Sequence, residues 1–478
     1  MSTFLVRFLF WAYLLFLIWA AATVTNPADP DLWHRLAVGE YLWQKGHFPN
    51  GDTFSYLSDY QKIADHEWGS AVVFYRLWQW GGGTAMVLTK IATLTVTLVL
   101  VVRAGIQNRL PTVLLAAFYW LVMLALLPSF QSTVRCMIFT HLFFALWLYW
   151  FQRERQGRVI PTILYVLSMI VWANLHGGFV IGLGWLLLVG VVEATHGAPW
   201  KIWATRFGLC GLATLVNPFG WQLWWSTGRA LIANRGGFAE WAPVSWTELW
   251  VYPGYKLLLI GVLISLGVLI RRLGRSQTAR TEVLLIGAFM VLALTSARHT
   301  SLFALVAGAL MPGLFPQARP FLRVEHPVRR LSAMAFNTAL IIVPLFSALL
   351  VLPGARLTLE YPPSSCPVAA VAFLQRENIR GNLLVPFNYG SYALWALRDR
   401  MRVSMDGRYD LVYRRETYRR VDDFFFARGD WKGLLTSPAP EAILVPRLDP
   451  VYPKLSAEAG WKEAWHNDDD AVFLPLAR

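Results

Sequence analysis

Charged residues are scarce in this 478-residue sequence, in which Asp, Glu, Lys and Arg together make up 15% of the chain. Typical soluble domains contain roughly 25% of these residues. Apolar residues are correspondingly abundant at 56%, and 24 residues are Trp. A soluble protein of this length does not need so much apolar surface, and the composition therefore favours a polytopic membrane protein.

Cysteine is also scarce, and the three cysteines form no pattern. Cys136 and Cys210 lie in apolar runs, whereas Cys366 stands alone. This spacing predicts neither a disulfide framework nor a zinc site. The sequence shows no internal repeat. It also has no Gly-rich phosphate loop after the first strand of its C-terminal part, so it does not indicate nucleotide binding.

Apolar runs recur through the first 353 residues, and crossing a bilayer takes about 20 such residues. The first run is longer than the apolar part of a signal peptide and lacks a clear cleavage site, so we expect it to be a retained span. We predict about eleven spans, at residues 4–24, 84–102, 111–128, 136–151, 160–175, 178–193, 203–217, 255–270, 282–297, 300–315 and 332–353.

The formal net charge of +14 could suggest nucleic acid as a partner. The basic residues, however, cluster in short loops, which is typical of membrane topology. With a cytoplasmic N-terminus, every cluster falls on the cytoplasmic side; the clusters lie within 103–109, 153–158, 201–206, 271–280 and 317–330. This topology places residues 354–478 outside the cytoplasm.

Polar residues that are unusual at span ends then gather on the opposite side of the membrane. Such side chains are costly at membrane depth unless they pair or face a cavity. We therefore predict one polar cavity at the outer leaflet, contributed by Asp29, Asp31, His34, His66, Glu67, Arg135, Asn174, His176, Asn217, Glu240, Arg298 and His299.

The chain is predicted to contain two domains. Residues 1–353 form a membrane domain whose first outer loop, 25–83, is too long for a simple connector. Within it, the Trp-rich patterns at 34–45 and 67–80 predict helices that lie along the membrane interface. Residues 354–478 form an extracytoplasmic α/β domain, with strands at 382–386, 401–405, 442–446 and 471–475 and helices at 366–378, 391–398, 413–427 and 450–459.

Two acidic residues, Asp29 and Asp31, follow the first predicted span and lie on either side of Pro30. The proline predicts extended or turn geometry for both. Either carboxylate could act as a general base on an acceptor hydroxyl, or help to hold a divalent cation. The alternative is structural, because Asp31 directly precedes a helical pattern and could be its N-cap.

His34 shares a predicted helix face with Asp31, and His66 and Glu67 lie in the same loop. Asp31, His66 and Glu67 together could form a metal site, although their spacing is not specific. The alternative for His66 and Glu67 is that they mark a second helix start beside an interfacial Trp.

Arg135, Arg298 and His299 are the natural candidates for holding an anion, because Arg binds phosphate bidentately and keeps its charge. The alternative for Arg135 is snorkelling to the interface. Asn174, beside His176, could instead satisfy a broken helix end. In the C-terminal domain, Asp406 and Arg408 are predicted to form a structural salt bridge, and residues 388–392 a loop that leads into a helix.

Taken together, these motifs resemble a bacterial group within the GT-C superfamily of membrane glycosyltransferases. The resemblance rests on DPDLWHRLAVGEYLWQKGHFPNGDTFSY, DHEW, WANLHGGF, NPFGW, EWAP, SARHTSLF and the DGR segment that follows a strand of the C-terminal domain. The likeness runs over most of the chain. It departs from oligosaccharyltransferases in lacking a WWDYG-type motif, which disfavours transfer of an oligosaccharide to Asn.

The resemblance implies a polytopic helical enzyme that transfers a sugar, with inversion, from a polyprenyl-phosphate donor to an acceptor hydroxyl outside the cytoplasmic membrane. The superfamily's essential acidic residue follows the first span, a role that falls here on Asp31 or Asp29. The expected partners are the lipid-linked sugar and an envelope acceptor, whether protein, lipid or glycan. Competing interpretations are a transporter or flippase for a lipid-linked anion and a non-catalytic envelope assembly protein.

Overall fold

The computed structural model describes most of the chain between residues 3 and 476. Outside the described residues lie 1–2, 61–62, 107–110, 132–133, 196, 198, 233–238, 274–276, most of 316–353, and 477–478. The last predicted span, 332–353, and the basic segment 317–330 therefore fall largely or wholly outside them. The chain divides into two compact units. Unit 1 comprises Met1–Asn26, Val87–Pro218 and Asn234–Thr358, and unit 2 comprises Pro27–Met86, Phe219–Ala233 and Leu359–Arg478.

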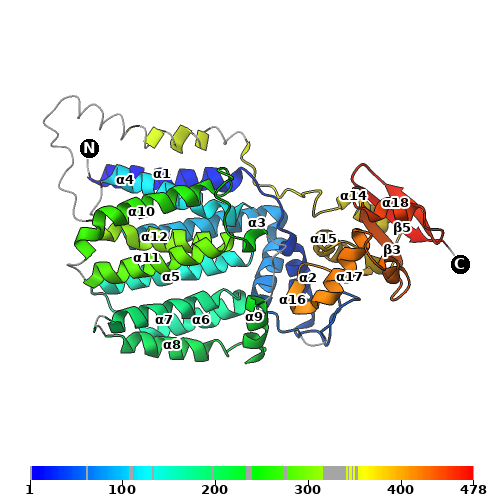
Figure 1. The fold of residues 1–478 in the computed structure, drawn as a ribbon, viewed down its shortest axis with the longest axis horizontal. Helices are drawn as coiled ribbons and strands as arrows, with labels where there is room; N and C mark the ends of the chain where they lie inside the picture. The colour runs from blue at the N-terminus through cyan, green and yellow to red at the C-terminus, as the bar shows by residue number, and fades with distance from the viewer. Residues whose placement is uncertain are drawn as a thin grey trace. The chain divides into compact units, whose positions relative to one another are not determined.

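Unit 1 is helical, and Figure 1 shows most of its helices running roughly parallel to one another. Its α-helices are α1 (Thr3–Thr23), the second part of α3 (Trp68–Gly105), α4 (Thr112–Leu126), α5 (Met137–Arg155), α6 (Thr162–Leu175), α7 (Phe179–Thr195), α8 (Lys201–Ala213), α10 (Pro253–Leu273), α11 (Gln277–Thr295) and α12 (Thr300–Leu314). Short 3₁₀ turns lie at η1 (Leu127–Phe130), η2 (Ala239–Trp241) and η3 (Ala297–His299).

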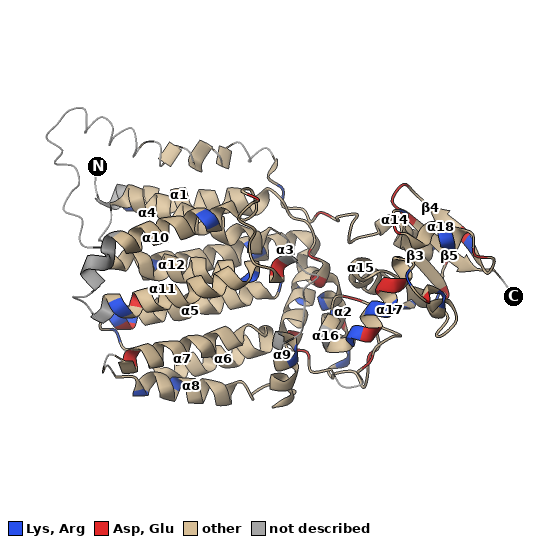
Figure 2. Cartoon of the chain, in the orientation of Figure 1, with Lys and Arg blue, Asp and Glu red and all other residues tan. Residues whose placement is uncertain are grey.

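Each predicted span from 4–24 to 300–315 coincides with one of these helices, because long apolar runs satisfy their backbone internally as helices. Charged residues lie mostly near the helix ends (Figure 2). By length and composition, two described helices can cross a membrane, Trp68–Gly105 and Thr112–Phe130, and four more are apolar but shorter. The count of about eleven spans and the orientation of the termini remain predictions.

Helix α3 is two helices joined at a kink. Gly81 and Gly82 have non-helical backbone angles, and Gly82 has a positive φ of 53° that favours glycine. The part before the kink, which begins at Trp68, belongs to unit 2, and the apolar part from Val87 belongs to unit 1. The glycines at 81–83 thus separate the predicted interfacial helix from the predicted span.

Unit 2 contains a five-stranded mixed sheet with the strand order β2-β1-β3-β5-β4. Its strands are β1 (Gly381–Leu384), β2 (Met401–Val403), β3 (Ala442–Pro446), β4 (Trp461–His466) and β5 (Asp470–Pro475). Strands β1, β2 and β3 are parallel, and β5 is antiparallel to β3 and β4. The surrounding helices are α2 (Pro30–Lys45), α9 (Gln222–Ile232), α14 (Val368–Arg376), α15 (Phe387–Leu397), α16 (Tyr409–Val412), α17 (Arg415–Phe425) and α18 (Val451–Ser456), with η5 (Trp431–Leu435).

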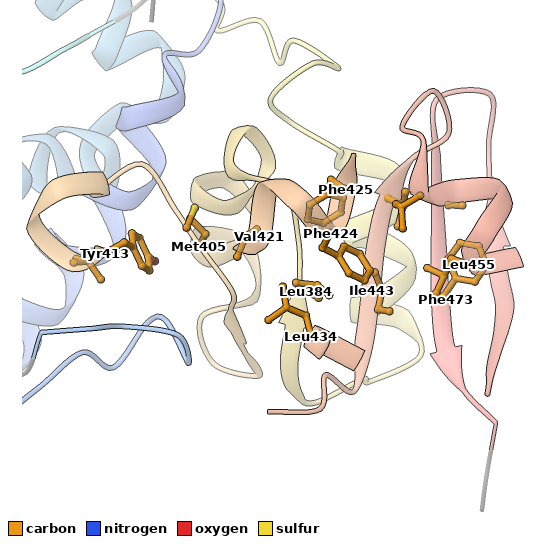
Figure 3. Packing of buried hydrophobic residues seen from close by; sticks show 14 of the residues in the cluster. Leu384, Met405, Tyr413, Val421, Phe424, Phe425, Leu434, Ile443, Leu455 and Phe473 are labelled. Carbon is orange, nitrogen blue, oxygen red and sulfur yellow. The ribbon is translucent and has the colours of Figure 1, made fainter. Parts of the chain in front are cut away.

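Apolar side chains from the strands and the covering helices form the core of this domain. Figure 3 shows Leu384 and Ile443 of the parallel strands facing Val421 and Phe424 of α17. Phe473 of β5 extends the same cluster. These side chains are almost fully buried, and each contributes roughly 1.5–3 kcal/mol to folding. The prediction of an α/β domain is confirmed.

Residues 27–83, most of the loop predicted to lie outside the membrane, belong to the same compact unit as the C-terminal domain. Ser55 forms a parallel bridge with Val403, so that the loop extends the sheet beside β2. Helix α2 packs on α15. It also approaches α3 at Gly39, where a Cβ atom would lie 2.0 Å from the Ala71 carbonyl oxygen. The compact unit is therefore larger than the predicted domain 354–478.

Three local predictions were wrong. Residues 388–392 are part of helix α15 and do not form a loop, because the helix already begins after Pro386. Strand β4 was missed, since its sequence WKEAWH is charged and its pairing with β5 is interrupted by a bulge. Asp31 is neither extended nor the N-cap of α2, as the next subsection describes.

Candidate active site

Helix α2 begins immediately after the chain leaves α1. Asp29 is its N-cap: its backbone is extended, and its side chain accepts a hydrogen bond from Asp31 N at 3.0 Å. Pro30 occupies the first turn, where its missing N–H costs nothing. Asp29 is 3% exposed, whereas Asp31 lies in the first helical turn and is partly exposed. The two carboxylates thus have different environments although they are two residues apart.

The DGR turn that follows β2, Asp406–Gly407–Arg408, lies against the start of α2. A Cβ atom at Gly407 would lie 2.7 Å from Asp31 Oδ1 and 2.9 Å from His34 Nδ1. It would also lie 2.9 Å from Ser391 Oγ. Any side chain at position 407 would therefore require these three side chains to move. The C-terminal domain therefore lies directly beside Asp31, one of the two carboxylates that the sequence predicts to be catalytic.

His34 is buried beside Asp31, with 1% of its surface exposed. Its Nδ1 lies 3.2 Å from Ser391 Oγ of helix α15. Burial, together with the charge of the neighbouring Arg35, lowers the pKa of His34 to about 4, although Asp31 acts to raise it. The imidazole is therefore neutral at physiological pH.

Arg35 joins α2 to the start of α3. Its guanidinium forms ion pairs with Asp65 and, at 3.1 Å, with Glu67. Asp65 also accepts a hydrogen bond from Glu67 N at 2.9 Å. The interpretation of this segment as a helix start is confirmed, since α3 begins at Trp68. His66 Nε2 lies 4.0 Å from Glu67 Oε1. Glu67 thus holds two helices together through Arg35.

The DGR turn is itself fixed by buried charges. Arg408 donates to Asp52 Oδ1 and Oδ2 at 2.9 Å each, and to Asp406 Oδ2 at 2.6 Å. Tyr413 donates its hydroxyl to Asp406 at 2.9 Å. Although burial raises the pKa of Asp406, the charge and hydrogen bonds of Arg408 outweigh it and lower that pKa to about 2. The predicted Asp406–Arg408 salt bridge is confirmed, and it extends through Asp52 to the segment between α2 and α3.

A metal site at Asp31, His66 and Glu67 requires their donor atoms to converge. Among the residues that the structure describes, no three His, Cys, Asp or Glu side chains are grouped to hold a metal ion. Glu67 instead contacts Arg35, and Asp31 faces the DGR turn.

Unit 1 contains a second polar cluster, which we call the arginine pair: Arg135 and Arg298, both bound to Glu240. Arg135 precedes α5 and donates to Glu240 Oε2 at 2.9 Å. Arg298 lies in η3 and donates to Glu240 Oε1 at 3.3 Å. The guanidinium of Arg298 also lies 4.8 Å from the ring centroid of Trp241. One carboxylate between two guanidiniums leaves a net charge of +1, and the three side chains are 22–30% exposed.

The remaining predicted residues of unit 1 close turns between helices. Gly178 N donates to His176 Nδ1 at 2.9 Å, and the Thr140 hydroxyl lies 2.7 Å from the same nitrogen. Asn174 donates to the carbonyl oxygens of Ile170 and Val216, both at 2.8 Å. These contacts match the expectation that Asn174 satisfies a helix end. His299 Nδ1 lies 3.2 Å from the Leu292 carbonyl oxygen.

The predicted site residues therefore form two groups. Asp29, Asp31, His34, His66 and Glu67 lie in unit 2, and Arg135, Asn174, His176, Glu240, Arg298 and His299 lie in unit 1. That both groups face one outer cavity remains a prediction. Ser391 and Gly407 lie beside His34 and Asp31, and Asp52 pairs with Arg408, but no pattern in the sequence predicts these contacts. The sequence signal at this place is the DGR turn, whose composition predicts a structural role.

The sequence matches no protein-family model and no curated protein. Solved structures with a similar fold include the oligosaccharyltransferase of Archaeoglobus fulgidus, at a TM-score of 0.61 and 11% identity over 91% of this chain and 69% of that one. ArnT of Cupriavidus metallidurans, bound to undecaprenyl phosphate, matches at a TM-score of 0.57 and 15% identity over 100% of this chain and 99% of that one. The mycobacterial arabinofuranosyltransferase AftD also has a similar fold, at a TM-score of 0.57 and 14% identity. The match covers 100% of this chain and 40% of that one.

The chain has the GT-C fold. A helical unit and a C-terminal α/β domain make up this fold, and the resemblance inferred from the motifs is confirmed at the level of the fold. In the GT-C fold of this chain, Asp31 stands in the first helix after α1, where the resemblance implies the essential acidic residue.

Proposed function

We propose that this protein is an inverting glycosyltransferase that moves a hexosyl or pentosyl group from a polyprenyl-phosphate donor to an acceptor hydroxyl. The reaction takes place on the outer face of a bacterial cytoplasmic membrane, with the N-terminus in the cytoplasm and the C-terminal domain outside. The observation that carries this proposal is the position of Asp31: it follows α1 directly in a GT-C fold and faces the DGR turn.

Asp31 is the better candidate for the general base. Asp29 is buried and its carboxylate caps α2, which fixes the start of the helix and with it the backbone of Asp31. Asp31 is partly exposed, so an acceptor hydroxyl can approach it from water. In the proposed step, Asp31 removes the proton of the acceptor hydroxyl while its oxygen attacks the anomeric carbon from the side opposite the phosphate. The bond between the anomeric carbon and the phosphate oxygen then breaks, which inverts the anomeric configuration.

The leaving group is a phosphate, which is stable as an anion and needs no general acid. The arginine pair is our candidate for stabilising the charge that develops on it, because guanidiniums bind phosphate oxygens bidentately. Arg135 and Arg298 bring two guanidiniums to the single carboxylate of Glu240. ArnT of Cupriavidus metallidurans, which has a similar fold, binds undecaprenyl phosphate.

The test compares envelope lipids and glycans by mass spectrometry in four strains: wild type, deletion, Asp31→Asn and Asp29→Asn. Asparagine is as good an N-cap as aspartate, so Asp29→Asn keeps the helix start and serves as the matched control. We expect Asp31→Asn, made at normal levels, to accumulate a polyprenyl-phosphate sugar and lose a glycan as the deletion does. Normal glycans in Asp31→Asn would refute the role of Asp31. A deletion strain with unchanged glycans and unchanged lipid-linked sugars would refute the enzyme class.

A further inference from the structure

One ring nitrogen of His34, Nε2, forms no hydrogen bond with the residues that the structure describes. The side chain is 1% exposed, and its Nε2 is buried with no hydrogen-bond partner among the residues that the structure describes. Burying an unsatisfied polar atom costs about 1–3 kcal/mol. Because buried polar atoms are usually hydrogen-bonded, this ring nitrogen, three residues after Asp31, is available for a hydrogen bond to a bound molecule.

The hydrogen bonds of Ser391 determine which nitrogen of His34 carries the proton. Ser391 Oγ accepts a hydrogen bond from Gly407 N at 2.9 Å, and His34 Nδ1 lies 3.2 Å away. A hydroxyl has one proton to donate, and within the described structure His34 Nδ1 is the acceptor available to it. If Nδ1 carried the proton instead, both the Ser391 proton and the Nε2 lone pair would be left buried without partners. The arrangement with fewer unsatisfied groups therefore has the proton on Nε2.

We propose that Ser391 and Gly407 hold His34 as the neutral tautomer protonated at Nε2, and that this N–H donates a hydrogen bond to an oxygen of the lipid-linked donor. The inference rests on the proposed function. It makes Ser391 and Gly407 positioning residues, and gives the C-terminal domain a part in binding the donor.

The choice of the donor over the acceptor follows from the chemistry of the attack. A hydrogen bond donated to the attacking hydroxyl oxygen would make that oxygen a weaker nucleophile, because it occupies lone-pair density that the new glycosidic bond requires. A hydrogen bond to a phosphate oxygen strengthens as negative charge develops there, and one to a sugar hydroxyl fixes the orientation of the ring. Both acceptors are oxygens of the same lipid-linked molecule.

The charges around His34 are consistent with a neutral donor. The imidazole lies among two cations, Arg35 and Arg408, and two carboxylates, Asp31 and Asp406. A protonated imidazole would add a third buried cation, and desolvation opposes this. A neutral N–H can bind an oxygen without that cost.

The tautomer is testable without any enzyme assay. We would record ¹⁵N spectra of the full-length protein in lipid bilayers with ¹⁵N-labelled histidine, and assign His34 by the signals lost in His34→Gln. At pH 7 we expect a protonated Nε2 and an unprotonated Nδ1. Ser391→Ala should give a mixture of tautomers, whereas Ser365→Ala, which alters another buried serine of unit 2, should leave the His34 signals unchanged. A proton on Nδ1 in the wild type, or an unchanged tautomer in Ser391→Ala, would overturn the proposal.

The ligand is tested by adding lipids to the same sample. A change in the Nε2 resonance on adding undecaprenyl phosphate would assign its partner to a phosphate oxygen. A change that requires the sugar-bearing lipid, purified from the Asp31→Asn strain, would assign it to a sugar hydroxyl. No change with either lipid would overturn the binding role of His34. Because these signals do not depend on turnover, the proposal can fail while glycosyl transfer is demonstrated, and the tautomer can be confirmed even if transfer is not.

Discussion

Arg408 forms a bidentate ion pair with Asp52. Each terminal nitrogen of the guanidinium donates a hydrogen bond, at 2.9 Å, to a different carboxylate oxygen. The two residues are 356 positions apart, and their side chains are 4% and 1% exposed. Asp52 lies between α2 and α3, and Arg408 lies in the DGR turn of the C-terminal domain. The pair therefore ties the loop that carries Asp31 to the turn that packs against it.

Replacing Arg408 should destabilise unit 2 strongly. Removing one partner of a buried ion pair leaves uncompensated charge and costs about 3–5 kcal/mol. In Arg408→Met two carboxylates, Asp52 and Asp406, lose their counter-ion. We expect a large decrease in the thermal midpoint of the purified protein, measured in detergent by intrinsic Trp fluorescence.

The matched control for this prediction is Arg428→Met in the same unit. Arg428 also pairs with two carboxylates, Asp422 and Asp423, but it is 54% exposed. Exposed pairs contribute about 0–1 kcal/mol, so the midpoint should barely change. Equal effects of the two substitutions would show that the buried cluster does not hold the loop.

Gly407→Ala should abolish most activity at a smaller cost in stability. The new methyl group would lie within 2.9 Å of the Asp31, His34 and Ser391 side chains, so these must move. A displacement of about 1 Å in a reacting group can cost roughly 100-fold in rate, while overpacking costs about 1–3 kcal/mol. Accumulation of the lipid-linked sugar in cells, measured beside the thermal midpoint, separates the two effects.

Gly433→Ala is the control for this glycine. Gly433 lies in η5, and its nearest side-chain atom would be 3.4 Å from the added Cβ atom. That is ordinary van der Waals contact, and we expect wild-type glycan profiles. The positioning role of Gly407 is refuted if Gly407→Ala keeps wild-type activity with a normal midpoint.

The helices of unit 1 were predictable because their signal is local. An apolar run of the necessary length forms a helix wherever it lies, since a bilayer offers no other partner for the backbone. The first residue of α2 could also be predicted from the sequence. Proline is favoured at the first helical position, so the residue before Pro30 is the natural N-cap. The alternative role of N-cap falls on Asp31 in the sequence because the apolar pattern begins after it, whereas the structure gives that role to Asp29.

The surroundings of Asp31 were not predictable in this way. Ser55 donates to the Ser404 carbonyl oxygen over a separation of 349 residues, and His34 meets Ser391 over 357. No periodicity or spacing in one sequence indicates such pairs. The DGR turn had the composition of an ordinary strand-end turn, and only the fold shows that Gly407 faces Asp31 and His34.

Acid should destabilise the protein through His34. Burial lowers its folded-state pKa to about 4, below the value of about 6.5 expected for the unfolded chain. Between these values the unfolded state binds more protons, so stability falls as the pH decreases. The contribution is present above about pH 6.5 and is lost by about pH 4, a loss of about 3 kcal/mol at 1.36 kcal/mol per pKa unit.

The thermal midpoint measured between pH 7 and pH 4 checks this dependence. His34→Gln, which cannot be protonated, should reduce the decrease in midpoint, whereas the same change at the exposed His47 should not. Identical pH profiles for wild type and His34→Gln would contradict a neutral, buried His34.

The arginine pair should determine affinity for the phosphate of the donor. Hydrogen bonds to charged groups contribute about 1.5–3 kcal/mol, so Arg298→Gln should weaken binding of undecaprenyl phosphate by roughly 10- to 100-fold. Native mass spectrometry of the detergent-solubilised protein measures this affinity directly.

A second arginine of unit 1 provides the control. Arg155 ends α5, pairs with Glu193 at 2.6 Å and is 20% exposed, close to the 22% of Arg298. Arg155→Gln therefore removes the same charge from a similar environment. Arg135 precedes the start of α5, so Arg155 lies at the other end of that helix, which we predict to be cytoplasmic. If phosphate is bound at the outer side, only Arg298→Gln weakens binding. Equal losses would mean that the lipid responds to net charge, and the arginine pair would no longer explain recognition of the leaving group.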